Sequence, residues 1–299
     1  YICIFSFSIS ILSFFNIIYS NYFNLYLNLD SYIYSLIISL LFGLVFLFKK
    51  KEEFKITIYE KIITVLLGYL ILPVFISIPY YFSIYNITFI NAYFEAVSGF
   101  TSTGFTIFDN IKHLDESLIL WRSSSQWIGG LYFLFSIILL IDIFDSNLKK
   151  SLTNYLSFNT TETLKQSIKI LILYTLLTFF IFIVLNFFNI RAFNSFNLAL
   201  TIISSGGFLP TNNLDSILNT KTKEIVLSLS MLISFFSLFL TYNLTTFKNK
   251  SINFFQEDFY LLIYFFILTI IFFVFLNTNN DFSQIFLALC SSISNIGIS

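Results

Sequence analysis

The chain has 299 residues, of which 57% are hydrophobic and only 11% are charged, and its formal net charge is +0. A soluble domain needs charge at about 25% of its positions, so this composition excludes an ordinary soluble protein. The balanced charge offers no attraction to a polyanion, and we expect no nucleic-acid partner. The mean hydropathy of +0.84 therefore predicts an all-α integral membrane protein in a lipid bilayer.

Long apolar runs alternate with short charged linkers along most of the sequence. A helix needs about 20 mostly apolar residues to cross about 30 Å of hydrocarbon, and several runs approach or exceed that length. We expect spans over residues 2–19, 32–48, 56–82, 118–144, 163–187, 224–247 and 259–276. The first two spans form a two-helix hairpin that precedes the others.

Lysines gather in alternate linkers, and this asymmetry predicts how the chain is oriented. The lysine-rich side carries Lys49, Lys50, Lys51, Lys55, Lys149, Lys150, Lys165, Lys169, Lys248 and Lys250. The other side carries fewer basic residues, namely Lys112, Arg191 and Lys221. Because cytoplasmic loops are enriched in Lys and Arg, we expect the lysine-rich linkers in the cytoplasm and the protein in the cytoplasmic (inner) membrane.

Three segments on the opposite side are too short to cross and mix apolar residues with Ser, Thr, Asn and Gly. They cover residues 89–105, 192–208 and 282–298. Gly207 lies 103 positions after Gly104, and Gly297 lies 90 positions after Gly207. The repeated unit is a span, a short helix, a hydroxyl-rich loop that ends in Gly, and a second span.

The repeat divides the chain into four predicted domains. They are an N-terminal two-span hairpin (1–48), a first pore repeat (52–155), a second pore repeat (156–250) and a truncated third pore repeat (251–299).

The hydroxyl-rich loops predict a filter for a monovalent cation. Irregular backbone at membrane depth is tolerated only where it lines a wet cavity or is buried in protein. Channels use a half-crossing helix and such a loop to turn carbonyl oxygens toward a dehydrated cation. Glycine allows the necessary backbone angles, and the C-terminal dipole of the short helix favours a cation. Oxygens without a fixed charge suit a monovalent ion better than a divalent one.

The predicted filter residues surround the final glycine of each loop. They are Thr101, Ser102, Thr103 and Gly104, then Ser204, Ser205, Gly206 and Gly207, then Ser294, Asn295, Ile296 and Gly297. The alignment of the second loop stays open, because either Gly206 or Gly207 can take the filter position.

Two stretches in the first repeat resemble the Trk/Ktr/HKT superfamily of potassium transporters, most closely its TrkH-type membrane subunit. The first is Ala92-Tyr-Phe-Glu-Ala-Val-Ser-Gly-Phe-Thr-Ser-Thr-Gly-Phe105. The second is Leu120-Trp-Arg-Ser-Ser-Ser-Gln-Trp-Ile-Gly-Gly130. Ser204-Ser-Gly-Gly-Phe208 is similar to the second filter of that family, and Ser294-Asn-Ile-Gly297 matches the third more loosely. The hairpin resembles the extra N-terminal unit of the TrkH type by position.

The resemblance implies uptake of potassium ions by a homodimer that a cytoplasmic nucleotide-binding subunit regulates, with no cofactor and no metal besides the transported ion. Members of this family have four pore repeats around one ion path. Since this sequence stops at a third filter, we expect a fragment that lacks the end of the third repeat and all of the fourth. Such a chain would not close a pore alone.

Five further residues of the first repeat are predicted to support the filter: Glu95, Arg122, Gln126, Gly129 and Gly130. A carboxylate at this depth is costly, so Glu95 either braces the loop from behind or faces the ions. Arg122 either anchors its helix to a loop carbonyl or an acid, or acts on the ions directly. The two glycines favour close helix packing.

Two other functions compete with this interpretation. A secondary transporter of another class would bind a small solute at broken helices near the bilayer midplane, but it predicts inverted repeats, whereas these repeats run parallel. A membrane enzyme would need clustered His, Cys, Asp or Glu, and this chain has one histidine, His113, and two distant cysteines, Cys3 and Cys290. We therefore do not expect an enzyme. Trp121 and Trp127 are predicted to anchor at the membrane interface.

Overall fold

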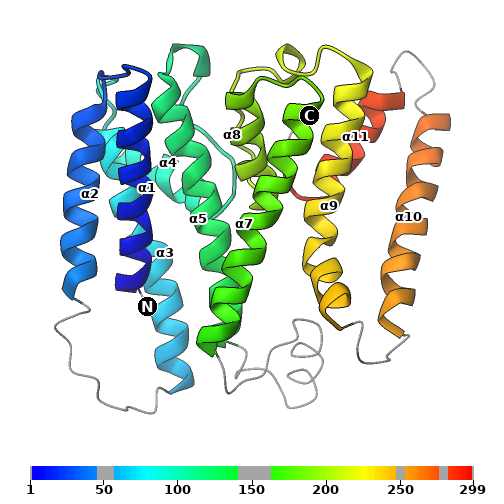
Figure 1. Cartoon of the computed structure of the whole chain (residues 1–299), viewed down its shortest axis with the longest axis horizontal. Coiled ribbons are helices and arrows are strands. Elements are labelled where there is room, and N and C mark those ends of the chain that lie inside the picture. Colours follow the sequence, from blue (N-terminus) through cyan, green and yellow to red (C-terminus); the bar gives the residue numbers. More distant parts are fainter. Residues whose placement is uncertain (1, 46–56, 141–162, 247–252, 276–281, 298–299) are drawn as a thin grey trace. The chain divides into compact units, whose positions relative to one another are not determined.

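The computed structural model describes residues 2–45, 57–140, 163–246, 253–275 and 282–297, and within these ranges every regular element is helical (Figure 1). This confirms the predicted all-α class. Each predicted span overlaps a helix, and among the described residues three helices are long and apolar enough to cross a membrane: Ile2–Tyr22, Ile58–Tyr81 and Ser167–Phe187. The lysine-rich linkers at residues 49–55, 149–150 and 248–250 lie outside the described residues.

The chain divides into two compact units. Unit 1 comprises residues 1–144 and 196–212, and unit 2 comprises residues 145–195 and 213–299. The three predicted domain boundaries, near residues 50, 155 and 250, fall outside the described ranges and stay predictions.

Unit 1 begins with the predicted hairpin, in which α1 and α2 lie side by side (Figure 1). Its elements are α1 (Ile2–Tyr22), α2 (Leu29–Leu44), α3 (Ile58–Tyr81), α4 (Phe89–Phe100), the 3-10 turn η2 (Ile111–His113), α5 (Glu116–Leu140) and the end of α8 (Ala192–Ile203). The short α4 packs between α3 and α5, whereas α1 contacts α2, α3 and α5.

Proline shapes the contact between α2 and α3. The capping box of Thr57 and Glu60 begins α3, where Thr57 N–H donates to Glu60 Oε2 at 2.7 Å. Pro79 inside α3 has no N–H, so the carbonyl of Phe75 loses its helical donor. Ser35 of α2 donates to that carbonyl at 3.3 Å, which satisfies it without water.

The hairpin docks on α5 through polar side chains. Asn16 Nδ2 donates to the carbonyl of Ser117 at 3.1 Å, and the Tyr32 and Ser117 hydroxyls share a hydrogen bond of 3.1 Å. Asn28 Nδ2 donates to Asp115 Oδ2 at 3.0 Å. In a bilayer the lipid tails are as apolar as leucine, so helices associate through close packing and hydrogen bonds of this kind.

We expect Asn16→Leu to weaken this docking, because the change removes the buried hydrogen bond from Asn16 to the Ser117 carbonyl. The loss should be about 1 kcal/mol, seen as a lower apparent midpoint of thermal unfolding in detergent. Asn21→Leu is the matched control, since Asn21 is exposed on the same helix and bonds only to Ile17 of its own turn. Equal midpoints for the two variants would contradict the docking role.

Unit 2 consists of the beginning of α8, together with α7 (Thr163–Phe187), the 3-10 turn η4 (Leu214–Ser216), α9 (Lys221–Thr246), α10 (Asn253–Phe275) and α11 (Phe282–Ile293). Within it α9 packs against α7 and α11, and α10 contacts α11. Large apolar side chains on α7 and α10, such as Ile183 and Ile270, are exposed in the isolated chain. Surfaces of this kind fit a lipid environment.

Three short helices recur at the spacing found in the sequence. Helices α4, α8 and α11 have 12 residues each. Helix α8 begins 103 residues after α4, and α11 begins 90 residues after α8. The 3-10 turns η2 and η4 are also 103 residues apart. The local structure of the short helix and the segment after it therefore repeats, as the alignment of the glycines predicts.

Candidate functional site

The chain after each short helix turns in the same way. Loop 1 (residues 101–105) follows α4, loop 2 (204–208) follows α8, and loop 3 (294–297) follows α11. The second residue of each loop has left-handed φ, namely 55° at Ser102, 51° at Ser205 and 57° at Asn295. Few residues other than glycine take this conformation. Its occurrence at three equivalent positions shows that the helices share one C-terminal cap.

A hydrogen bond across each cap fixes the equivalence of the loops. The N–H of Thr103 donates to the carbonyl of Ser98 at 2.9 Å, and that of Gly206 donates to the carbonyl of Thr201 at 2.8 Å. In loop 3, Ile296 N–H donates to the carbonyl of Ser291 at 3.1 Å. These six-residue closures are typical of Schellman caps. They make Gly206 equivalent to Thr103 and Ile296, and Gly207 equivalent to Gly104 and Gly297.

The first hydroxyl of each loop closes the helix behind it. Thr101, Ser204 and Ser294 donate to the carbonyl four residues earlier, at 2.8, 2.9 and 2.7 Å. The carbonyls of Val97 and Cys290 also accept the backbone N–H of the same loop residue, so there the hydroxyl adds a second bond to a carbonyl that is already paired. Thr101, Ser204 and Ser294 therefore use their hydroxyl hydrogens within the helix, and their lone pairs remain able to accept.

Loops 1 and 2 both belong to unit 1 and meet at their glycines. A Cβ added to Gly104 would lie 2.8 Å from Gly207 Cα, and Gly104 has φ of 83°. Both the contact and the backbone angle require glycine. Gly297 in loop 3, which belongs to unit 2, also has positive φ, at 68°. A Cβ added to Gly297 would meet no described atom within 4 Å.

A hydroxyl of the short helix holds the chain beyond each of the first two glycines. Ser98 Oγ donates to the carbonyl of Phe105 at 2.6 Å, and Thr201 Oγ1 donates to the carbonyl of Phe208 at 3.0 Å. These pairs are equivalent in the repeat. Each loop is therefore tied to its own helix on both sides of its glycine.

A buried ion pair braces loop 1. Arg122 Nε lies 2.9 Å from Glu95 Oε1, and the two side chains are 1% and 0% exposed. Glu95 accepts from the Thr106 hydroxyl at 3.0 Å and from Ile107 N–H at 2.9 Å, and Arg122 Nη2 donates to Thr106 at 3.0 Å. Of the two roles left open for Glu95, these contacts favour the brace behind the loop.

Arg122 also contacts loop 2. Its guanidinium lies 4.3 Å from the centre of the Phe208 ring and 5.5 Å from that of Phe108. A desolvated cation over an aromatic face contributes about 2 kcal/mol. One arginine of α5 therefore contacts loop 2 and the chain just after loop 1.

Gln126, one turn further along α5, binds loop 2. With its amide oriented to suit its neighbours, the side-chain nitrogen donates to Thr201 Oγ1 at 3.2 Å. The side-chain oxygen accepts from Gly207 N–H and Phe208 N–H, both at 3.1 Å. The sequence assigned Gln126 to the support without identifying its partner. The spacing of four residues from Arg122 was the available signal, because it places both side chains on one helix face.

Two glycines allow α5 to approach α4. A Cβ on Gly129 would overlap the carbonyl of Phe100, and one on Gly99 would overlap the Ser125 hydroxyl. Gly129 thus packs closely, as expected of small residues in membrane helices. Its neighbour Gly130 is half-buried.

One expectation for this helix is wrong. Trp121 does not present its ring to the lipid headgroups as an anchor, because its side chain is 2% exposed and its indole N–H donates to the carbonyl of Ile76 at 3.0 Å. The indole is buried against α3, where it can both pack and donate.

Among the described residues, no group of three or more His, Cys, Asp or Glu side chains could hold a resident metal ion. The chemistry that the loops offer is therefore that of neutral carbonyl and hydroxyl oxygens.

We expect Glu95→Gln to destabilise the protein by about 3–5 kcal/mol, because it leaves the buried Arg122 without a counter-charge. The double variant Glu95→Leu/Arg122→Met should be less damaged than either residue changed alone, since no charge is then left unpaired. Apparent unfolding midpoints in detergent provide the comparison. Strictly additive losses would show that the two side chains do not act as a pair.

Several known proteins are similar to this chain. The family model TrkH, a cation transport protein, matches residues 30–262. An uncharacterized cation transporter of Methanocaldococcus jannaschii is 29% identical over 186 residues, which are 58% of this chain and 37% of that protein. The Trk system potassium uptake protein TrkG of Escherichia coli K12 is 34% identical over 83 residues, or 27% of this chain and 17% of TrkG.

Longer matches have lower identity. The Trk system potassium uptake protein TrkH of Escherichia coli K12 is 25% identical over 195 residues, or 62% of this chain and 40% of that protein. The crystal structure of the potassium transporter TrkH from Vibrio parahaemolyticus shares the fold, with a TM-score of 0.73 and 16% identity, over 98% of this chain and 63% of that one. The chain thus spans well under half the length of these curated relatives.

Proposed function

Because this chain belongs to the TrkH family of cation transport proteins, we propose that it forms part of a potassium uptake protein whose filter consists of backbone carbonyls. Loops 1, 2 and 3 each supply one segment of that filter. The Trk potassium uptake proteins among its relatives support potassium as the transported ion.

The contact between Gly104 and Gly207 is the observation that carries this proposal. It brings together two irregular loops, each at the C-terminus of a short helix, where the partial negative charge of the helix favours a cation. The carboxylate of Glu95 is paired with Arg122, so a cation at the loops meets neutral oxygens without a fixed charge. Such ligands suit a weakly hydrated monovalent ion.

The competing interpretation, a transporter that binds a small solute at broken helices, has less support. It requires helices interrupted near the midplane, whereas α3 and α7 run unbroken over 24 and 25 residues. The irregular backbone of unit 1 instead follows the short helices α4 and α8.

The proposal also covers the membrane location, the orientation and the partners of the protein. The lysine asymmetry supports a cytoplasmic membrane location with the lysine-rich linkers in the cytoplasm. The resemblance to the TrkH type supports a homodimer and a cytoplasmic nucleotide-binding regulatory subunit. The second copy of the chain and the regulatory subunit are proposed as partners of the full-length gene product.

We expect the full-length gene product to restore growth of a potassium-uptake-deficient bacterium at low external potassium, and Gly104→Ala to abolish this rescue. The added Cβ would strain a residue with φ of 83° and press on the backbone of Gly207. Uptake of rubidium and sodium at equal membrane abundance is the measurement. If any flux survives, sodium uptake should rise relative to rubidium.

Gly43→Ala is the matched control for this experiment. Gly43 lies in α2 of the hairpin, and its added Cβ would meet the side-chain ring of Phe7 at 2.9 Å, which can shift more easily than backbone. We expect the control to retain rubidium uptake. No rescue by well-expressed wild type would refute the proposed function, and unchanged selectivity of Gly104→Ala would refute the place of loop 1 in the filter.

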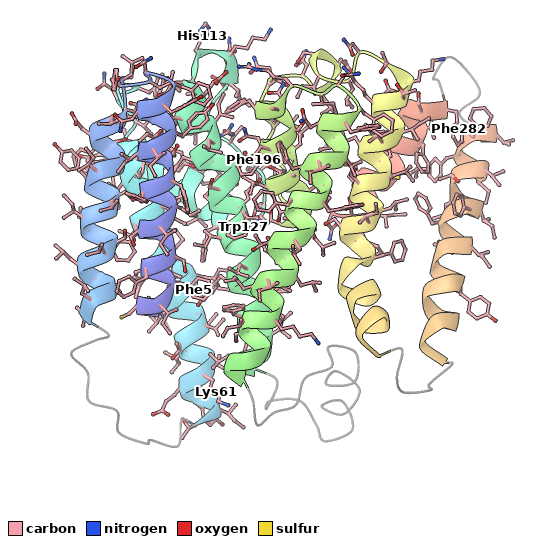
Figure 2. The ribbon with its side chains drawn as sticks, viewed as in Figure 1. Phe5, Lys61, His113, Trp127, Phe196 and Phe282 are labelled. Carbon is pink, nitrogen blue, oxygen red and sulfur yellow. The ribbon has the colours of Figure 1, made fainter. Side chains whose placement is uncertain are left out.

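The orientation is tested by accessibility. Figure 2 shows Lys61 and His113 at opposite ends of unit 1. In a background without Cys3 and Cys290, we expect His113→Cys to react with a membrane-impermeant thiol reagent added outside intact cells, and Tyr59→Cys to react only after the cells are opened. Both positions are exposed. The reverse pattern would overturn the topology and place the loops on the cytoplasmic side.

A further inference from the structure

We propose that Gln126, a residue of the first pore repeat, is a positioning residue that sets the ion selectivity of loop 2 in the second repeat. The inference rests on the proposed function, since it concerns how that filter is held. Gln126 reaches loop 2 from α5, and its three hydrogen bonds there, to Thr201, Gly207 and Phe208, span 3.1–3.2 Å.

The direction of these bonds determines where the carbonyls point. In a trans peptide the N–H and the C=O lie on opposite sides of the unit. The N–H of Gly207 shares its peptide with the carbonyl of Gly206, and the N–H of Phe208 shares its peptide with the carbonyl of Gly207. Because both N–H groups bind the same oxygen of Gln126, both carbonyls turn away from α5. Two successive carbonyls on one side of the chain are what a cation filter requires.

The sequence of loop 2 gives independent support for the contact between Gln126 and this loop. Loops 1 and 3 carry Thr103 and Ile296 at the position where loop 2 has Gly206. A Cβ on Gly206 would overlap the amide of Gln126. Gly206 does not have a positive φ, so its backbone conformation does not explain why this position carries glycine. The approach of Gln126 does, and the two residues form a matched pair.

Loop 1 is braced differently, by an acceptor on α4 that a residue of α5 holds in place. There the acceptor is the charged Glu95, which is held by Arg122, and it binds Ile107 N–H beyond the glycine. In loop 2 the acceptor is a neutral amide, and it binds the N–H of the glycine itself. Arg122 and Gln126 lie four residues apart, so a displacement of α5 would act on both loops together.

The test compares variants of Gln126 in the full-length gene product, expressed in a potassium-uptake-deficient bacterium. Gln126→Leu keeps the approximate volume but removes the acceptor, and Gln126→Asn keeps the amide but is too short to hold both N–H groups. Initial rates of rubidium and sodium uptake are measured over a range of concentrations at equal membrane abundance. Ser123→Ala is the control, because Ser123 is buried on the same helix but bonds only to Ile119 of its own turn.

We expect the sodium-to-rubidium ratio to rise about tenfold in Gln126→Leu and Gln126→Asn, which corresponds to about 1.4 kcal/mol of lost discrimination. Ser123→Ala should stay within about threefold of wild type, which corresponds to a change of no more than about 0.7 kcal/mol. If Gln126→Leu does not reach the membrane, Gln126→Asn decides the question.

A lower maximal rate with an unchanged ratio in Gln126→Leu and Gln126→Asn would show a merely structural role and overturn the inference, as would an equal rise of the ratio in Ser123→Ala. These outcomes require a wild type that takes up rubidium selectively. A wild type that takes up no rubidium would instead refute the proposed function, so the two failures are distinguishable.

The pairing with Gly206 gives a second measurement. Gly206→Ala should impair uptake strongly in the wild-type background and less in the Gln126→Asn background, where the shorter amide leaves room for the methyl group. A double-mutant cycle on rubidium uptake measures this coupling. Additive effects would show that Gly206 is not fitted to Gln126 and would contradict the inference.

Discussion

The arrangement of unit 1 depends on one constraint, which is that irregular backbone at membrane depth needs a partner for every polar group. Loops 1 and 2 leave the helical pattern directly after α4 and α8, and each meets this need with the same cap. The Schellman bond, the hydroxyl that returns to the helix and the hydroxyl that holds the residue after the glycine all recur. The N–H groups near the two glycines then require acceptors. Gln126 of α5 is the acceptor for loop 2, and Glu95 of α4, held by Arg122 of α5, is the acceptor for the chain after loop 1.

The side chains of α5 that make these contacts give the helix one polar face. Arg122, Ser125, Gln126 and Gly129 lie at spacings of three, four and seven residues, which places them on one face toward α4 and the loops. This polar face explains why α5, although it has 25 residues, is not among the helices that are apolar enough to cross a membrane by composition. A helix whose polar face packs against such loops is shielded from lipid on that side, so hydropathy underestimates its ability to span a membrane.

Much of the fold was accessible from sequence because it is local and repeated. The short helices and their spacing follow from the pattern of hydroxyl residues and glycines, whereas the equivalence of Gly207 with Gly104 needed the cap hydrogen bonds. The partners of Gln126 and Trp121 were not accessible, because each side chain reaches a segment that lies far away in the sequence, at Thr201 and Ile76. The docking of Asn16 on Ser117 was missed for the same reason. Long-range contacts between polar residues leave no periodic trace.

The glycines of the site are needed for different reasons, which a sequence motif alone does not reveal. Gly104 is needed for its backbone angle and for its contact with Gly207. Gly129 leaves room for the carbonyl of Phe100, and Gly206 leaves room for the amide of Gln126. The first two face backbone, which cannot retreat without unfolding the cap or the helix. Gly206 faces the end of a side chain, which another residue can shorten. Among these positions, Gly206 is therefore the one where a second substitution can compensate for a lost glycine. At this position the loops can differ in sequence while they keep the same cap.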